Sequence, residues 1–121
     1  MSGLSKRPLA FALLFLALAG QADAAELLMY RRAGCAWCAA WDQAIGPIYP
    51  KTEVGRQLPM RFVDLDKAAE PAVALVRPVH YTPTFVLVDD GREIGRIEGY
   101  PGEDFFWGLL DKLARGLPAR S

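Results

Sequence analysis

Four short stretches of the chain have the hydrophobic pattern of β-strands. One is an apolar run bounded by charged residues, two alternate polar with apolar positions, and one follows a proline and is rich in β-branched residues. In the second stretch, Met60, Phe62 and Leu65 are the apolar positions that we expect to point inward. The predicted strands span residues 26–30, 60–66, 82–88 and 93–98.

Other stretches have the spacing of amphipathic helices. From Ala36 onward, apolar residues recur every three or four positions until Gly46-Pro47 interrupts the pattern, because proline breaks a helix. Residues 103–115 place acidic side chains in the first turn and basic ones in the last, as the helix dipole favours. A shorter helix is predicted over residues 68–76. The apolar stripes of the first and last helices are Trp37, Trp41, Ile45 and Ile48, and Phe106, Leu109, Leu110 and Leu113.

The order of these elements predicts the fold class. The last two strands flank Asp89-Asp90-Gly91-Arg92, a turn signal, and therefore form an antiparallel hairpin. The first two strands and the helix between them form a right-handed parallel crossover. The sequence thus predicts an α/β domain with a mixed four-stranded sheet flanked by helices.

The first 24 residues have the pattern of a secretory signal. A basic segment with Lys6 and Arg7 precedes an apolar run from Leu9 to Ala19, and small residues follow up to Ala24. The apolar run is too short to cross a hydrocarbon core of about 30 Å comfortably. We expect residues 1–24 to be a signal peptide that directs residues 25–121 to the periplasm. An uncleaved N-terminal anchor is the alternative, and it would export the same domain.

The charge of the chain limits its partners. Its 14 basic and 14 acidic residues balance, and no cluster of basic residues marks a nucleic-acid site or a membrane patch. We therefore expect no nucleic-acid partner, and we expect a monomer without a cofactor.

The two cysteines of the chain lie where the first predicted strand gives way to a helix. At a helix N-terminus, unpaired backbone N–H groups and the macrodipole favour an anion, so a cysteine there is acidified. Cys38 lies one helical turn from Cys35, close enough to form a disulfide. Arg31 and Arg32 lie just upstream and add positive potential. The spacing suits a dithiol that cycles between thiol and disulfide.

Two other interpretations of the cysteine pair remain open. Zinc needs about four ligands, and His80 is the single histidine of the chain. An inert structural disulfide is the other possibility, although a bridge that closes so short a loop restricts the unfolded chain little.

Two motifs of the chain resemble those of the thioredoxin superfamily. They are Cys35-Ala36-Trp37-Cys38 at the strand-to-helix junction and Thr82-Pro83-Thr84-Phe85 at the start of the third predicted strand. The hairpin and the last helix agree with this resemblance, which covers residues 25–117. It implies the thioredoxin fold and thiol–disulfide oxidoreductase activity. Within the superfamily, residues 29–49 look similar to the thioredoxin-like protein that accompanies periplasmic sulfur-oxidation systems.

The resemblance also implies roles for individual residues. Cys35 would attack the substrate disulfide, and Cys38 would be the buried resolving thiol. Pro83 would be the cis-proline of the family, although cis is uncommon for an X–Pro bond. The backbone of the residue before it would pair with a bound peptide, as in strand addition. The implied rim of the substrate site is Trp37, Thr82, Pro83 and Tyr100.

The chain also departs from thioredoxin itself. Thioredoxin has Gly-Pro between its cysteines, where this chain has Ala36-Trp37. Thioredoxin has a buried acid six residues before the first cysteine, where this chain has Met29. The sequence therefore suggests that the general base of thioredoxin is missing.

We expect a periplasmic enzyme that reduces disulfides or mixed disulfides on an exported protein through Cys35 and Cys38. A component of a sulfur-oxidation system is one candidate partner, and a membrane thiol-transfer protein would supply the electrons. Two rival functions are a non-catalytic binding or chaperone module with an inert disulfide, and a metal carrier that uses the two cysteines and His80.

Overall fold

A mixed four-stranded sheet forms the centre of the protein. The computed structural model describes residues 24–67 and 72–118, together with Gly3. The predicted signal peptide therefore lies almost entirely outside the described residues. The strands are β1 (Glu26–Arg31), β2 (Met60–Asp64), β3 (Thr84–Asp89) and β4 (Arg92–Glu98), and the helices are α1 (Ala36–Ala44), α2 (Glu53–Gln57) and α3 (Glu103–Ala114).

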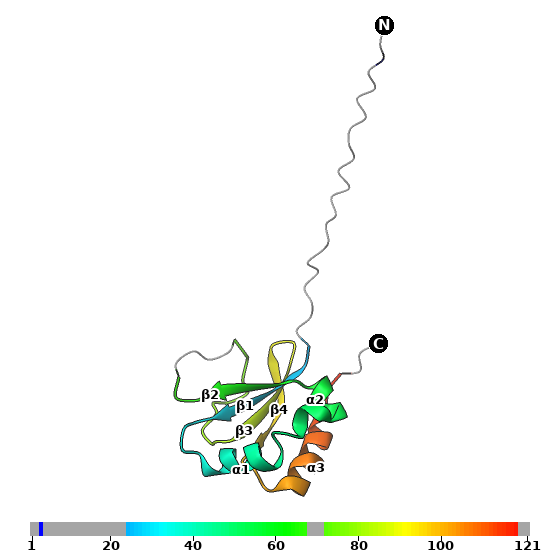
Figure 1. The fold of residues 1–121 in the computed structure, drawn as a ribbon. Coiled ribbons are helices and arrows are strands. Elements are labelled where there is room, and N and C mark those ends of the chain that lie inside the picture. Colours follow the sequence, from blue (N-terminus) through cyan, green and yellow to red (C-terminus); the bar gives the residue numbers. More distant parts are fainter. Residues whose placement is uncertain (1–2, 4–23, 68–71, 119–121) are drawn as a thin grey trace.

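The strand order is β2-β1-β3-β4 (Figure 1). β1 pairs with β2 in parallel, as a crossover through α1 requires. β3 is antiparallel to both β1 and β4. This arrangement confirms the predicted fold class, in which a parallel β-α-β unit is followed by an antiparallel hairpin. Within the part of the chain that the structure describes, no helix is long and apolar enough to cross a membrane.

The three helices lie on one side of the sheet (Figure 1). Alternate residues of β1 and β3 point toward them, because successive side chains of a strand face opposite ways. From the helices, Trp41 and Ile45 of α1 and Phe106 and Leu110 of α3 are buried in this core. The predicted stripes are therefore confirmed at these four positions, whereas Ile48 and Leu109 are exposed.

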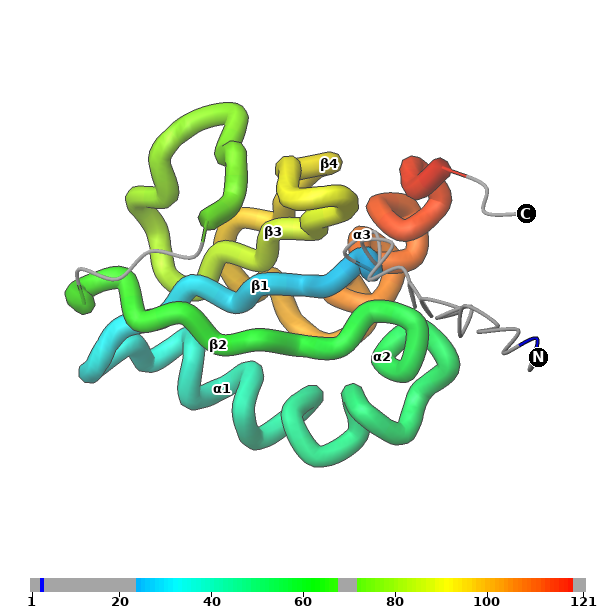
Figure 2. The backbone as a smooth tube through the Cα atoms, turned by 90° about the horizontal axis from the view of Figure 1, so that it is seen from above, coloured from blue at the N-terminus to red at the C-terminus, as the bar shows by residue number. Residues whose placement is uncertain are grey.

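An extended segment covers the opposite face of the sheet. The prediction of a helix over residues 68–76 is wrong for residues 72–76, the part that the structure describes. There, Ala74 forms an isolated parallel bridge with Arg92. Its amide donates to Gly91 (2.9 Å) and its carbonyl accepts from Glu93 (3.0 Å). Pairing with the hairpin thus replaces the hydrogen bonds of a helix. Residues 68–71 lie outside the described residues. Figure 2 shows the described part of the segment, from residue 72 onward, passing beside the hairpin of β3 and β4.

The strand β2 is shorter than predicted, and one position expected to be buried is exposed. We expected Phe62 to be buried, yet it is 57% exposed, and Val63 is the buried residue of the strand. The reason is that β2 lies at the edge of the sheet. The Phe62 ring meets Trp41 of α1 edge-on at 6.4 Å and otherwise lies open at this edge.

Two glycines in helices should respond in opposite ways to alanine. A Cβ atom at Gly55 in α2 would overlap the carbonyl oxygen of Tyr49, whereas one at Gly108 in α3 would meet nothing within 4 Å. We expect Gly55→Ala to lower the free energy of unfolding by about 1–3 kcal/mol, as overpacking does. Gly108→Ala should raise it by about 0.5–1 kcal/mol, because alanine favours a helix. Urea denaturation measures both, and equal effects would contradict the packing described for α2.

Candidate active site

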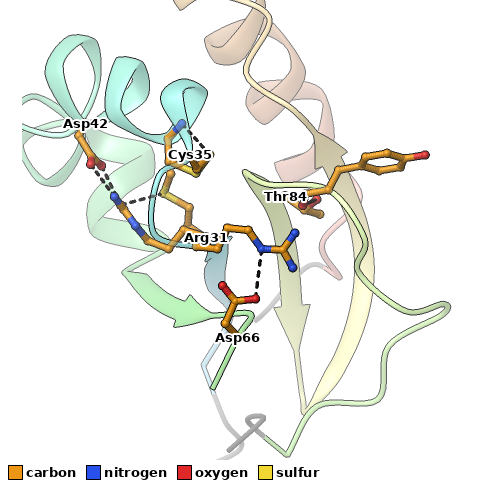
Figure 3. The surroundings of a disulfide bond; sticks show 9 residues. Arg31, Cys35, Asp42, Asp66 and Thr84 are labelled. Carbon is orange, nitrogen blue, oxygen red and sulfur yellow. Dashed lines mark hydrogen bonds and ion pairs between the residues drawn. A yellow bond between two sulfur atoms is a disulfide. The ribbon is translucent and has the colours of Figure 1, made fainter. Parts of the chain in front are cut away.

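The two cysteines lie at the end of the sheet where strand β1 stops and helix α1 begins. Gly34 has φ of +78°, a conformation that suits glycine, and it turns the chain into the helix. Cys35 is the N-cap of α1, and Cys38 lies in the first turn. The two form a disulfide with Cα atoms 5.2 Å apart. The Cys35 Sγ also accepts a hydrogen bond from the Cys38 amide at 3.1 Å, as Figure 3 shows.

The two sulfurs differ in their access to solvent. Cys35 is half-buried, whereas Cys38 is 1% exposed and belongs to the core. Trp37 lies between them in sequence and is 63% exposed. A partner molecule can therefore approach Cys35 and Trp37 more easily than Cys38.

The start of β3 lies at the same end of the sheet as the disulfide. Thr84 of β3 pairs with Tyr30 of β1, which places Thr82-Pro83 beside the turn that carries the cysteines. The Thr82–Pro83 peptide bond is cis, as the resemblance implied. The Gly99 amide donates to the Pro83 carbonyl at 2.7 Å, so the last residues of β4 also lie at this end of the sheet. The fold thus brings together the segments that contain the predicted rim residues.

Tyr100 follows Gly99 and is half-buried. Its ring meets Phe106 of α3 at 6.2 Å, and burial together with the charge of Glu103 raises the pKa of its hydroxyl. Tyr81, just before Thr82, is 64% exposed, and our reading of the sequence did not include it. The aromatic side chain beside a Thr-Pro motif was the available signal.

A groove of about 620 Å³ opens beside the disulfide on the β2 side. Among the described residues, its lining includes neither Trp37 nor the Thr82–Pro83 pair. Sequence analysis missed this groove because it depends on Phe62 lying open at the edge strand. The lining residues are Arg31, Arg32, Ala33, Gly34, Cys35, Ala36, Cys38, Ala39, Phe62 and Asp64.

Arg31 is one of the charged residues that line this groove, and it is paired with Asp42. The guanidinium donates two hydrogen bonds to the Asp42 carboxylate, at 2.8 and 2.6 Å, and this pairing raises the pKa of Arg31. Figure 3 shows the pair beside Cys35. The same guanidinium lies 5.0 Å from the centre of the Phe62 ring and 3.7 Å from the sulfur of Met29.

The expected positive potential upstream of Cys35 is therefore partly balanced. Asp42 pairs with Arg31, and Asp66 lies 3.3 Å from Arg32. Met29 is fully buried in β1. The guanidinium of Arg31, paired with Asp42, thus lies next to Met29, the residue at the position where thioredoxin has its buried acid.

The described residues contain no group of three or more His, Cys, Asp or Glu side chains that could hold a metal ion. His80, which we considered as a ligand with the two cysteines, is exposed. Its role as a metal ligand gains no support from this geometry.

The chain is 47% identical to the periplasmic thioredoxin SoxS from Paracoccus pantotrophus, whose crystal structure is of the reduced form. The match covers 76% of this chain and 97% of SoxS, with a TM-score of 0.73. This chain belongs to the thioredoxin family. With the cysteines at the spacing of the family's redox pair, it is a thiol–disulfide oxidoreductase. Thioredoxins act on disulfides of proteins.

More distant thioredoxins show the same fold. Thioredoxin of Malassezia sympodialis is 18% identical, with a TM-score of 0.54 and coverage of 77% of both chains. Thioredoxin of Fasciola hepatica is 20% identical, also with a TM-score of 0.54, over 73% of this chain and 79% of its own. Neither a scan of protein-family models nor a search of the curated proteins found a match.

The two members of the Arg31–Asp42 pair should shift the reduction potential in opposite directions. A nearby cation stabilises a thiolate and hence the reduced form, so Asp42→Asn, which frees Arg31, should make the potential less negative. Arg31→Gln leaves the carboxylate and should make it more negative. We expect shifts of about 10–20 mV, because a half-exposed charge contributes up to about 1 kcal/mol and about 30 mV corresponds to 1.4 kcal/mol.

The measurement is equilibration of each variant with glutathione buffers. The variant with both substitutions is the control and should return close to the wild-type potential. Shifts of the same sign in both single variants would show that the pair acts through structure and not through charge.

Proposed function

We propose that this protein is exported to the periplasm and there reduces disulfides of a partner protein through Cys35 and Cys38. The observation that carries this proposal is the unequal exposure of the two cysteines at the start of α1. Cys35 is accessible and Cys38 is 1% exposed. One sulfur can therefore react with a large substrate while the other is protected from it.

The reaction proceeds in two exchanges. The Cys35 thiolate attacks one sulfur of the substrate disulfide, forming a mixed disulfide and releasing the other substrate sulfur as a thiolate, which takes up a proton. Cys38 then loses its proton and attacks the Cys35 sulfur. The substrate leaves with both sulfurs reduced, and the enzyme keeps the Cys35–Cys38 disulfide. The N-terminus of α1 and the hydrogen bond from the Cys38 amide stabilise negative charge on Cys35.

The proton of Cys38 leaves without the buried acid of thioredoxin. Met29 occupies that position and has no proton-accepting group. The groove on the β2 side borders both Cys35 and Cys38. We infer that water in this groove accepts the proton.

The surface around Thr82 and the disulfide is better suited to bind a protein substrate than a small disulfide. An extended peptide can pair with the backbone at Thr82, before the cis-proline, by strand addition. Trp37 and Tyr81, which lie close in sequence to the disulfide and to Thr82, are both largely exposed. Exposed aromatic side chains of this kind are typical of protein interfaces, because they offer a large contact area together with a polar group.

The proposed compartment rests on two supports. The first is the signal-like segment 1–24 with its basic and apolar parts. The second is the similarity to SoxS, which is a periplasmic protein. An oxidising compartment would hold the pair as a disulfide, so a membrane thiol-transfer protein is the proposed electron donor. A component of a sulfur-oxidation system is the proposed partner, on the resemblance of residues 29–49.

Cys38→Ser should accumulate a mixed disulfide with protein substrates, because the resolving thiol is missing. Cys35→Ser should accumulate none, since its remaining sulfur is buried. Non-reducing gel electrophoresis of periplasmic extracts treated with each reduced variant measures the adducts, and a variant without both cysteines is the control. Equal trapping by both single variants would contradict the assigned roles. Full function in the variant without cysteines would instead favour the binding or chaperone module.

Export should remove the first 24 residues. We expect mass spectrometry of the periplasmic fraction of a Gram-negative host to find a chain that begins at Ala25, because small residues precede this position. A variant whose apolar run is interrupted by an arginine at Leu14 should remain uncleaved in the cytoplasm. Recovery of the intact wild-type chain in the membrane fraction would support the anchor instead.

A further inference from the structure

A buried ion pair lies on the face of the sheet opposite the helices. Glu93 and Arg96 of β4 form two close contacts, from Nε to Oε2 at 2.6 Å and from a terminal nitrogen to Oε1 at 2.7 Å. Their side chains are only 2% and 5% exposed. Among the ion pairs of the described residues, this one is the most deeply buried.

A β-bulge brings these two side chains together. Residues three apart in a regular strand point to opposite faces of a sheet. Here the register shifts between Leu87 and Val88: Gly95 pairs with Leu87 and Glu93 with Val88, so Ile94 is the extra residue. Glu93 and Arg96 therefore share one face, where their strand partners Val88 and Val86 belong to the apolar core.

The remaining donors and acceptors of the pair hold the backbone of residues 76–78. The Glu93 carboxylate accepts from the Val76 amide at 2.9 Å. The Arg96 guanidinium donates to the carbonyls of Arg77 at 2.7 Å and Pro78 at 3.3 Å. Arg96, by its hydrogen bonds, lowers the pKa of Glu93, although burial opposes this shift. The pair therefore remains ionised at neutral pH.

Apolar packing does not fix this stretch. Val76 is 73% exposed, and Arg77 and Pro78 are exposed as well. A buried ion pair seldom contributes more to stability than apolar side chains of the same volume, but its directional bonds can specify one conformation. Here those bonds end on the backbone of an irregular segment, and together with the ion pair of Arg77 with Glu98 at 2.6 Å they define its path.

The segment held in this way leads directly into the active site. Val79 follows Pro78 and is buried in the core of this face. Tyr81 and Thr82 come next, and the Thr84 hydroxyl donates to the Tyr81 carbonyl at 2.6 Å. The four residues from Val79 to Thr82 thus span the distance between the ion pair and the cis-proline.

We propose that Glu93 and Arg96 are positioning residues for the substrate side of the active site. By fixing residues 76–78, they hold Tyr81 and Thr82 in place to receive a protein substrate, and they take no part in the chemistry of the sulfurs. This inference rests on the proposed function, in which the backbone at Thr82 binds a peptide.

The test compares a protein disulfide with a small one. We expect Arg96→Gln and Glu93→Gln each to raise the KM for insulin about fivefold to tenfold, with kcat changed less than twofold. The rate with 2-hydroxyethyl disulfide and the reduction potential should remain those of the wild type, because the surroundings of Cys35 are unchanged. Arg96→Lys, which keeps the charge but loses the bidentate geometry, should recover part of the affinity for insulin.

The control is Asp111→Asn, which removes one partner of the exposed pair with Arg115 on α3 and should change no parameter. If the glutamine variants do not fold, Glu93→Leu combined with Arg96→Met replaces the charges by apolar side chains of similar volume. This folded variant should show the same rise in KM. An unchanged KM in folded variants, or an equal loss of activity toward both disulfides, would overturn the inference.

Failure of the proposed function would look different. A wild-type enzyme that reduces 2-hydroxyethyl disulfide but not insulin would refute the protein-disulfide reductase. Amide hydrogen exchange of residues 79–82 would then decide the present inference. Faster exchange in Arg96→Gln than in Asp111→Asn supports a positioning role, and equal rates overturn it.

Discussion

The placement of α1 depends on the burial of Trp41. Its ring contacts Phe62 of β2, Phe85 of β3 and Phe106 of α3, with centroids 5.6–6.4 Å apart. Truncation of a tryptophan buried in this way typically costs about 3–5 kcal/mol. Because Cys38 lies three residues before Trp41, the same packing fixes the first helical turn against the end of β1. The chemistry of the site thus depends on a side chain that never meets the substrate.

The two sides of the disulfide contribute different things to the enzyme. On the β2 side, Arg31 and Phe62 line a groove, and Asp42 partly balances the charge of Arg31. Cys35 also lies at the N-terminus of α1, where the backbone of the helix favours a negative charge. On the β3 side, the segment before the strand offers the backbone at Thr82 and the exposed ring of Tyr81. The β2 side therefore offers a groove beside the sulfurs, and the β3 side offers the surface on which we propose that a protein substrate binds.

The sequence predicts the parts of this protein that local context decides. Cys35 and Cys38 follow from their spacing at a strand-to-helix junction, and the hairpin follows from its turn residues. Other parts depend on contacts between distant residues. The alternation in β4 does not reveal the bulge at Ile94, so the pairing of Glu93 with Arg96 is invisible in the sequence. Residues 72–76 have helix-forming alanines, yet pairing with the hairpin prevails.

The bridge between Ala74 and Arg92 has a further consequence, for solubility. β4 is an edge strand, and an edge strand exposes unpaired N–H and C=O groups on which another polypeptide can add a strand and begin to aggregate. Ala74 occupies two of these backbone groups at the start of β4. The Arg96 guanidinium, drawn toward Arg77 and Pro78, keeps the same segment close to the rest of the strand. The segment that leads to the active site thereby also covers the first backbone groups of this edge strand.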